Sequence, residues 1–206
     1  MAISDFSELK AAIAEWLWKT GETSTTAAIP DMIAMAEGHF NRRLTVRKMD
    51  AVEASLTITS GVATLPTGFR SLKSLRLTDS PYTKVSYKPI DWIESQDPAN
   101  TRPPEFYDRV GDELIMWPPT SATARLRYRK AFTVLSDAAP TNWLLTAHPD
   151  LYLMASLSYG TAFGVSDDRI PIFKALAQQA LDEINIEDRN LNEDGVQMQT
   201  SVTTIV

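Results

Sequence analysis

Residues 51–61, AVEASLTITSG, mark the point where the sequence changes from helical to strand periodicity. Apolar and polar residues alternate along this stretch, which predicts a strand with one buried face and one exposed face. The apolar positions are Val52, Ala54, Leu56 and Ile58, and the Ser60-Gly61 pair that follows them indicates a turn. The stretch therefore predicts that a β domain begins at residue 51.

Short strand-like segments continue beyond this stretch, separated by proline and glycine. They are residues 72–78, 83–87, 106–110, 113–117 and 124–132. Gly111-Asp112 between two of them indicates a tight hairpin, and the sequence of residues 89–96 predicts a short helix. We predict that residues 51–135 form an antiparallel β domain.

Helical periodicity lies on both sides of the β domain. Before it, we expect one helix that ends at Gly21 and a second with Pro30 in its first turn. After it, we expect a third helix from Pro149 and a fourth that is capped by Asp167 or Asp168.

The predicted fold class is α+β. Two N-terminal and two C-terminal helices would form a bundle of four long α-helices from residues 1–50 and 136–190, with the antiparallel β domain inserted between them. Residues 191–206, LNEDGVQMQTSVTTIV, have no helical face and are rich in β-branched and small polar residues. We therefore expect them to form an extended C-terminal arm.

The composition is that of a globular protein. Hydrophobic residues make up 44% of the chain and charged residues 22%, cysteine is absent, and the net charge is −6. Without cysteine the chain can hold no disulfide, zinc-thiolate site or thiol nucleophile. The negative charge disfavours general attraction to nucleic acid, so any DNA contact would be local. No apolar stretch approaches membrane-spanning length.

No sequence motif points to catalysis or to a cofactor. His39 and His148 stand beside no nucleophile or second ligand, and the glycines are not clustered as in a phosphate-binding loop. The adjacent carboxylates Asp182 and Glu183 diverge on a helix, as on a solvated face. We therefore expect no catalytic residue, no metal site and no cofactor, and we predict that the chain is not an enzyme.

Arginine and tryptophan supply the candidate contacts to other subunits. Within AEGHFNRRLTVRK, residues 36–48, Arg43 and Arg47 lie one helical turn apart, and Arg42 projects to the opposite side. Trp16 and Trp18 diverge by about 200° on a helix, so one of them needs a partner outside the helix's own core face. The alternatives are that this tryptophan stays partly exposed, contacts the chain's own β region, or lies in an interface with another subunit. The arginines would form ion pairs within the protein or across a subunit contact, and we take Arg42, Arg43, Arg47 and Trp18 as candidate interface residues.

A second basic set lies in ARLRYRK, residues 124–130. Arg125, Arg127 and Arg129 alternate with apolar residues and therefore share one face of a strand. This face would either be solvated opposite acidic neighbours across the sheet, or meet another subunit or the phosphates of DNA.

Three segments together resemble a known family. They are AEGHFNRRLTVRKMDA (residues 36–51), SLTITSGVATLPTGF (residues 55–69) and RLRYRKAFTVLSDAAPTNWLLTAHPDLYLMASL (residues 125–157). In order and spacing they resemble the head-to-tail adaptor proteins of tailed bacteriophages, the ring proteins beneath the portal. The likeness runs over residues 5–190.

The resemblance implies a structural virion protein that is made and assembled in the host cytoplasm. Copies would form a ring, commonly of twelve, that docks on the portal and passes DNA through its channel without sequence-specific binding. The ring would also offer an attachment surface to the downstream tail or nozzle protein. The C-terminal arm would lie along the portal through Leu191, Val196, Met198, Val202, Ile205 and Val206. No cofactor and no membrane are implied.

Three other functions stay open at this stage. A head-completion or stopper ring protein would sit one layer further down in the same assembly. A tail-associated cell-wall or polysaccharide hydrolase would need two facing carboxylates in a cleft of the β domain. A DNA-binding module would use the arginines and would show an affinity that falls steeply with salt.

Overall fold

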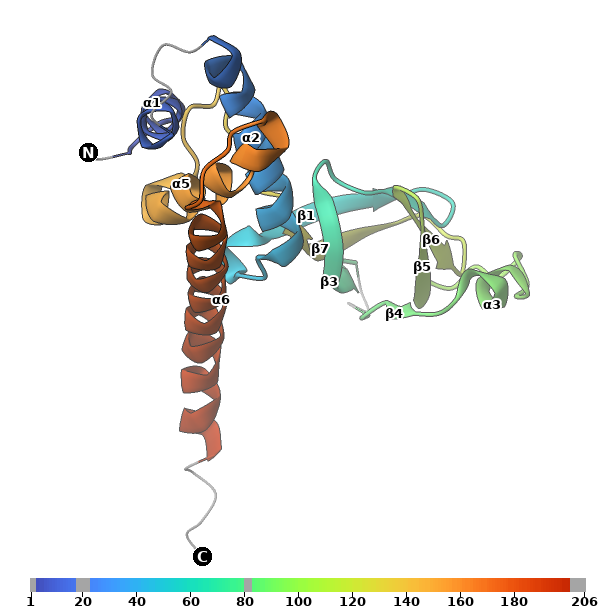
Figure 1. The fold of residues 1–206 in the computed structure, drawn as a ribbon. Coiled ribbons are helices and arrows are strands. Elements are labelled where there is room, and N and C mark those ends of the chain that lie inside the picture. Colours follow the sequence, from blue (N-terminus) through green and yellow to red (C-terminus); the bar gives the residue numbers. More distant parts are fainter. Residues whose placement is uncertain (1–2, 18–22, 80–82, 201–206) are drawn as a thin grey trace, which may run out of the picture. The chain divides into compact units, whose positions relative to one another are not determined.

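The computed structural model describes residues 3–17, 23–79 and 83–200, with side chains for residues 3–17, 26–79 and 83–191. The chain divides into two compact units, and most of their helices and strands are labelled in Figure 1. We call Met1–Arg47 together with Phe132–Val206 the helical unit, and Lys48–Ala131 the β unit.

The β unit consists of two sheets and one short helix. The first sheet has antiparallel strands in the order β1 (Asp50–Ile58), β7 (Ala122–Lys130) and β3 (Phe69–Leu77). The second has the order β2 (Val62–Thr64), β6 (Glu113–Trp117), β5 (Phe106–Val110) and β4 (Ser86–Tyr87), and α3 (Ile90–Glu94) follows β4. Strands β4 and β5 pair in parallel, so the prediction of a wholly antiparallel domain was wrong at this edge. The connection through α3 is long enough for the crossover that a parallel pair requires.

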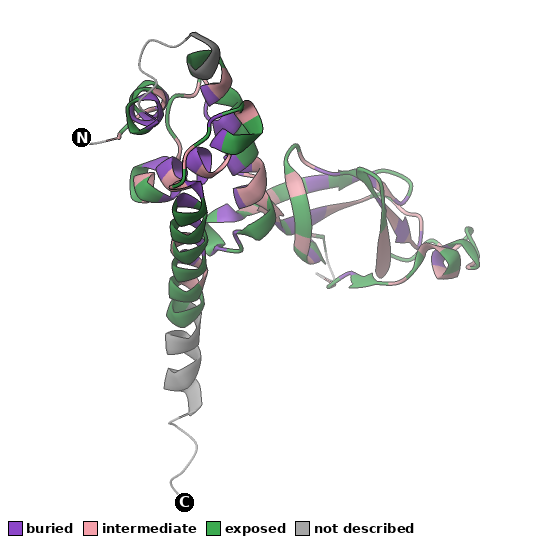
Figure 2. Cartoon of the chain, viewed as in Figure 1, coloured by how far each residue is buried: buried purple, intermediate pink, exposed green. Residues whose placement is uncertain are grey.

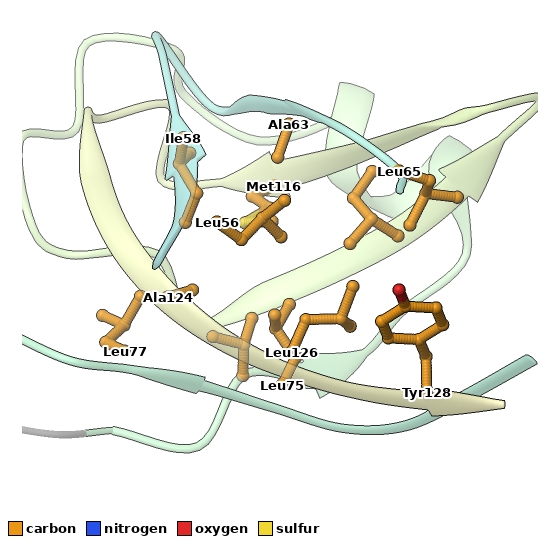
Figure 3. Close-up of a cluster of buried hydrophobic side chains, with 12 residues drawn as sticks. Leu56, Ile58, Ala63, Leu65, Leu75, Leu77, Met116, Ala124, Leu126 and Tyr128 are labelled. Atoms are coloured by element: carbon orange, nitrogen blue, oxygen red, sulfur yellow. The ribbon is translucent and has the colours of Figure 1, made fainter. Parts of the chain in front are cut away.

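The core of the β unit lies between the two sheets (Figure 3). Leu75 of β3 and Leu126 of β7 are fully buried, and their side chains point toward the same space as Met116 of β6. Along β7 buried residues alternate with exposed ones, so the strand gives one face to the core and the other face to solvent. Each fully buried leucine contributes about 1.5–3 kcal/mol.

Strand β1 departs from the simple alternation of its sequence. Its register with β7 pairs Val52 with Arg127 and then shifts by one residue between Glu53 and Leu56. Leu56 is buried as predicted, whereas Val52 is 47% exposed and Ala54 is also exposed. A bulge changes the side of the sheet that the residues before it face. The prediction that Val52 and Ala54 share the buried face was therefore wrong, and Val52 lies beside Arg127 on the outer face.

The helical unit contains helices of very different length. They are α1 (Phe6–Trp16), α2 (Thr23–Arg43), α4 (Trp143–Ala147), α5 (Pro149–Ser158) and α6 (Ile170–Thr200), with a 3-10 turn at Gly160–Phe163; a second 3-10 turn, Arg47–Met49, spans the boundary with the β unit. The prediction of a bundle of four long helices was wrong, because the described residues form six helices of which four reach seven residues. Of these four, α1 has 11 residues and α5 has 10. Helix α5 ends early because a 3-10 turn and the left-handed Gly164 follow it.

Helix α2 begins at Thr23, well before Pro30, so the expected start with Pro30 in the first turn was wrong. A proline inside a helix costs about 3 kcal/mol. Ile29, Met32 and Ile33 around it are almost completely buried, and this packing offsets that cost. Tertiary contacts therefore decide the start of the helix.

The C-terminal segment is helical where the structure describes it. Helix α6 continues to Thr200, so the prediction of an extended arm was wrong for residues 191–200. Leucine, glutamate, glutamine and methionine in this stretch are good helix formers. Most of the β-branched residues that suggested an arm belong to residues 201–206, which lie outside the described part of the chain.

A buried carboxylate holds α2 to the segment that returns from the β unit. Glu37 of α2 is 3% exposed, and its Oε1 accepts hydrogen bonds from the backbone N–H of Leu135 at 2.7 Å and the hydroxyl of Tyr152 at 2.9 Å. The Asn142 side chain donates to the Tyr152 hydroxyl at 2.7 Å and also caps α4. The ring of Tyr152 packs edge-on against Phe40. One carboxylate thus joins three segments of the helical unit.

Burial raises the pKa of Glu37, and the hydrogen bonds from Leu135 and Tyr152 offset part of this effect. The folded protein therefore binds more protons than the unfolded chain from about pH 4.3, the ordinary glutamate pKa, up to the raised value. The contribution of Glu37 to the free energy of unfolding is fully present below that window and is lost as pH rises through it. We expect the free energy of unfolding to fall with pH across the window in wild type and to fall less in Glu37→Gln, as measured by urea unfolding at a series of pH values. Parallel profiles would contradict this.

Candidate interaction surfaces

Two polar residues of α6 bind the chain that follows α2. The Asn185 Oδ1 accepts hydrogen bonds from the backbone N–H of Thr45 at 2.9 Å and its hydroxyl at 3.2 Å. The Asp188 Oδ1 accepts from the backbone N–H of Arg47 at 3.1 Å and from its Nε at 3.3 Å. The ion pair is partly exposed, so it contributes at most about 1 kcal/mol. Arg47, a predicted subunit contact, is thus already engaged within its own chain.

Arg42 and Arg43 lie in the last turn of α2, where both are exposed. Cations at this end of a helix interact favourably with the helix dipole. Neither forms an ion pair with another residue in the described part of the chain. Charge reversal at Arg42 and Arg43 therefore tests contacts to other subunits without breaking an ion pair among the described residues. Charge reversal at Arg47 would instead place a second carboxylate beside Asp188.

The groove beside His39 does not have the composition of a catalytic site. It has a volume of about 280 Å³ and is lined by residues that include Phe40, Ser158, Lys174 and Leu181, with no carboxylate among them. Burial lowers the pKa of His39, and the charges of Arg42, Arg43 and Lys174 act in the same direction. A histidine without an acidic partner lacks the group that would orient it as a general base. Among the described residues, no cluster of histidine and carboxylate side chains could hold a metal ion.

The outer face of the first sheet carries a concentration of positive charge. We call it the cationic sheet face: Lys73 and Arg76 of β3 with Arg125, Arg127 and Arg129 of β7. The three arginines of β7 stand opposite the side of the strand that carries buried Ala124, Leu126 and Tyr128. The sequence prediction that the β7 arginines share one face of a strand is confirmed.

The expected acidic neighbours are largely missing from this face. Across the strands, Arg127 pairs with Val52 and Ser74, while Arg125 pairs with Arg76. The one acidic residue paired with the arginines of β7 is Asp50, opposite Arg129, and it forms an ion pair with Lys73. In the described part of the chain, Arg76, Arg125 and Arg127 form no ion pair. The face is therefore cationic rather than neutralised by its own sheet.

Arginine directly opposite arginine weakens a strand pair. We expect Arg125→Glu, which places a carboxylate opposite Arg76, to raise the free energy of unfolding by about 0.5–1 kcal/mol. Arg125→Gln removes the repulsion without adding an attraction, so its effect should be smaller. Urea unfolding followed by circular dichroism measures both changes. A destabilised Arg125→Glu protein would show that Arg125 has a favourable contact within its own chain.

The other predicted contact residues fall in three groups. Leu191 lies on α6 and is 57% exposed. Val196 and Met198 lie on α6 with side chains outside the described part, and Trp18, Val202, Ile205 and Val206 lie outside the described residues. Trp16 contacts Phe173 of α6 edge-on at 6.0 Å and remains 40% exposed. The partner of Trp16 is thus in its own helical unit.

Sequence reasoning missed several residues of these surfaces. Lys73 and Arg76 join the cationic sheet face only through the register of β3 with β7, which no single segment reveals. The sequence FRSLKSLRL, residues 69–77, gives no such signal, because Arg70, Lys73 and Arg76 stand three residues apart and strict alternation would place Lys73 and Arg76 on opposite faces. Asn185 and Asp188 were missed because their partners lie about 140 residues away in the sequence.

One family model covers almost the whole chain: the SU10 adaptor protein model matches residues 4–201. The chain belongs to this family. It is a family of phage head-to-tail adaptors, so the resemblance seen in the sequence is confirmed. No curated protein matches the chain.

Membership makes the adaptor a structural phage protein and a component of the virion that interacts with other head and tail proteins. No described helix has the length and apolar character needed to span a membrane.

Proposed function

We propose that copies of the adaptor form a ring that docks coaxially on the portal, extends the DNA channel and provides the attachment surface for the tail or nozzle protein. The number of copies is commonly twelve in the proteins that the sequence resembles. The family match supports this proposal. The ring performs no catalysis and takes no cofactor, and its activity is to couple two assemblies mechanically. A head-completion or stopper ring is the alternative within the same assembly.

The observation that carries the proposal is the exposure of α6. Its buried residues lie on one side, and most of the described helix is exposed (Figure 2). Asp188, which pairs with Arg47, lies well before the end of the helix at Thr200. Leu191 beyond it is 57% exposed. A helix with exposed apolar residues is suited to a partner protein that covers them.

In this proposal the last turns of α6 bind the portal, and residues 201–206 extend that contact. Arg42, Arg43 and Trp18 add contacts to the portal or to neighbouring subunits. Portal binding would cover the exposed leucine, and burial of such a side chain contributes about 1.5–3 kcal/mol. The helical unit would then face the portal, and the β unit would supply contacts within the ring.

Replacing Leu191, Val196 and Met198 together with serine is expected to weaken binding to portal rings at least about tenfold, because a loss of 1.4 kcal/mol already corresponds to that factor. Sedimentation of the adaptor with purified portal rings measures this. The matched control is Ile172→Ser at the other end of α6, which is 58% exposed and should bind as wild type does. Equal binding of the triple variant and wild type would remove α6 from the portal contact.

A further inference from the structure

The cationic sheet face carries charge that its own unit does not neutralise. The β unit has 12 lysine and arginine residues against 10 aspartate and glutamate residues, a net charge of +2. The helical unit has 8 against 16, a net charge of −8. The two units thus carry net charges of opposite sign. The positive charge of the β unit includes arginines that have no ion-pair partner among the described residues.

The complementary surface is on α6. Asp182, Glu183 and Glu187 are exposed, and none of them forms an ion pair in the described part of the chain. Gln178 and Gln179 donate hydrogen bonds to Asp182 and Glu183 at 2.9 and 2.8 Å, which leaves the negative charges in place. Glu183 and Glu187 lie one turn apart, where like charges destabilise a helix. Arg76 opposite Arg125 is the corresponding like-charge pair of the sheet face.

The two surfaces match in spacing as well as in sign. Arg125 and Arg127 are two residues apart on a strand, about 6.7 Å. Glu183 and Glu187 are four residues apart on a helix, about 6 Å. Each surface also holds one exposed apolar residue beside its charges: Val52, 47% exposed, is paired with Arg127, and Ile186, 45% exposed, lies next to Glu187.

We infer that the cationic sheet face of one copy binds the acidic edge of α6, Glu183, Ile186 and Glu187, in the next copy. Arg125 and Arg127 donate to the two carboxylates, for which the planar arginine fork is well suited, and Val52 packs against Ile186. The contact joins two different surfaces, so it is head-to-tail, and contacts of this kind generate rings when the rotation closes. The inference rests on the proposed ring and names the surfaces through which its copies meet.

DNA is the other polyanion that arginines could bind. The net charge of −6, which combines −8 on the helical unit with +2 on the β unit, opposes its approach. The exposed Val52 among the arginines also suits a protein surface better than a phosphate backbone. The observations therefore favour a second copy of the chain.

Disulfide trapping tests the contact directly, because the chain has no cysteine of its own. One preparation carries Val52→Cys and another carries Ile186→Cys. The two preparations are mixed and then oxidised, once without portal rings and once with them. We expect cross-linked dimers that contain one chain of each kind. The matched control replaces Val52→Cys with Val110→Cys, 50% exposed on β5 of the same unit, and should give little dimer.

Charge exchange provides the second measurement. Arg125→Glu with Arg127→Glu, added to the Val52→Cys chain, should lower the dimer yield roughly tenfold or more, because like charges across an interface oppose association. Adding Glu183→Arg with Glu187→Arg to the Ile186→Cys partner should restore the yield. Restoration between separate chains requires a contact between copies.

The outcomes separate this inference from the proposed function. Rings on the portal without the Val52–Ile186 cross-link would overturn the inference and leave the ring intact. The cross-link without portal rings would support the inference and count against portal docking, and the absence of both would overturn both. A further outcome assigns the cationic sheet face to DNA binding and overturns the inference. In that outcome the cross-link is absent, and wild type shifts double-stranded DNA in a gel at low salt, whereas the double variant Arg125→Glu with Arg127→Glu does not.

Discussion

Replacing Glu37 with alanine is expected to lower the free energy of unfolding by about 2–5 kcal/mol. The substitution leaves the backbone N–H of Leu135 and the hydroxyl proton of Tyr152 without their acceptor in a buried site. Each donor left unsatisfied costs about 1–3 kcal/mol. Urea unfolding near pH 4.3, the lower end of the window in which burying the charged carboxylate costs stability, measures the change.

The matched control is Glu37→Gln, which keeps an oxygen at the position that accepts both hydrogen bonds. It should retain most of the stability that alanine loses. A Glu37→Ala protein within about 0.5 kcal/mol of wild type, the range of an ordinary surface substitution, would show that this network does not hold the helical unit together.

Replacing Gly61 with alanine is expected to destabilise the protein by about 3 kcal/mol or more. Gly61 has a φ of +79°, and the left-handed conformation alone costs other residues about 1–2 kcal/mol. A Cβ at this position would lie 2.7 Å from the Pro119 Cα and 2.8 Å from the Met116 carbonyl oxygen. These are backbone atoms, which cannot move aside cheaply, so the clash adds to the conformational cost. Thermal or urea unfolding measures the loss.

Gly111→Ala is the control for the conformational part alone. Gly111 has a φ of +61°, and nothing lies within 4 Å of an added Cβ. It should cost about 1–2 kcal/mol. Equal effects of the two substitutions would mean that the turn at Gly61 relaxes without penalty.

Local patterns predicted the strands of the β unit well. Strands β5 and β6 coincide with the predicted residues 106–110 and 113–117, because Gly111 interrupts two runs of β-forming residues and adopts a positive φ between them. The turn at Ser60-Gly61 also lies where its residues indicated, with positive φ at both positions. Turn chemistry and alternation act over a few residues, so a single segment contains the information.

Properties that depend on pairing could not be predicted from single segments. The bulge in β1 follows from its register with β7, and it moves Val52 from the expected core to the outer face. The parallel pairing of β4 with β5 likewise depends on where a long connection returns. Helix lengths were also misjudged. Burial around Pro30 and helix formers such as Glu193, Gln197 and Met198 after Leu191 accompany an α2 and an α6 that run beyond their apparent signals.

The charged residues illustrate the same division. The sequence showed that the arginines of β7 share a face, and the register added Arg76 opposite Arg125. Arg47 was expected to contact another subunit, and it pairs with Asp188 of its own chain. A partner 141 residues away cannot be found from the local pattern around either residue.

The central claim is that this phage adaptor acts through the surfaces that it offers to its own copies and to the portal. Electron microscopy of the purified chain mixed with portal rings of the same phage tests it most directly. The account predicts a second ring, coaxial with the portal and open at its centre. Portal rings that remain bare under conditions in which the chain is folded would contradict it.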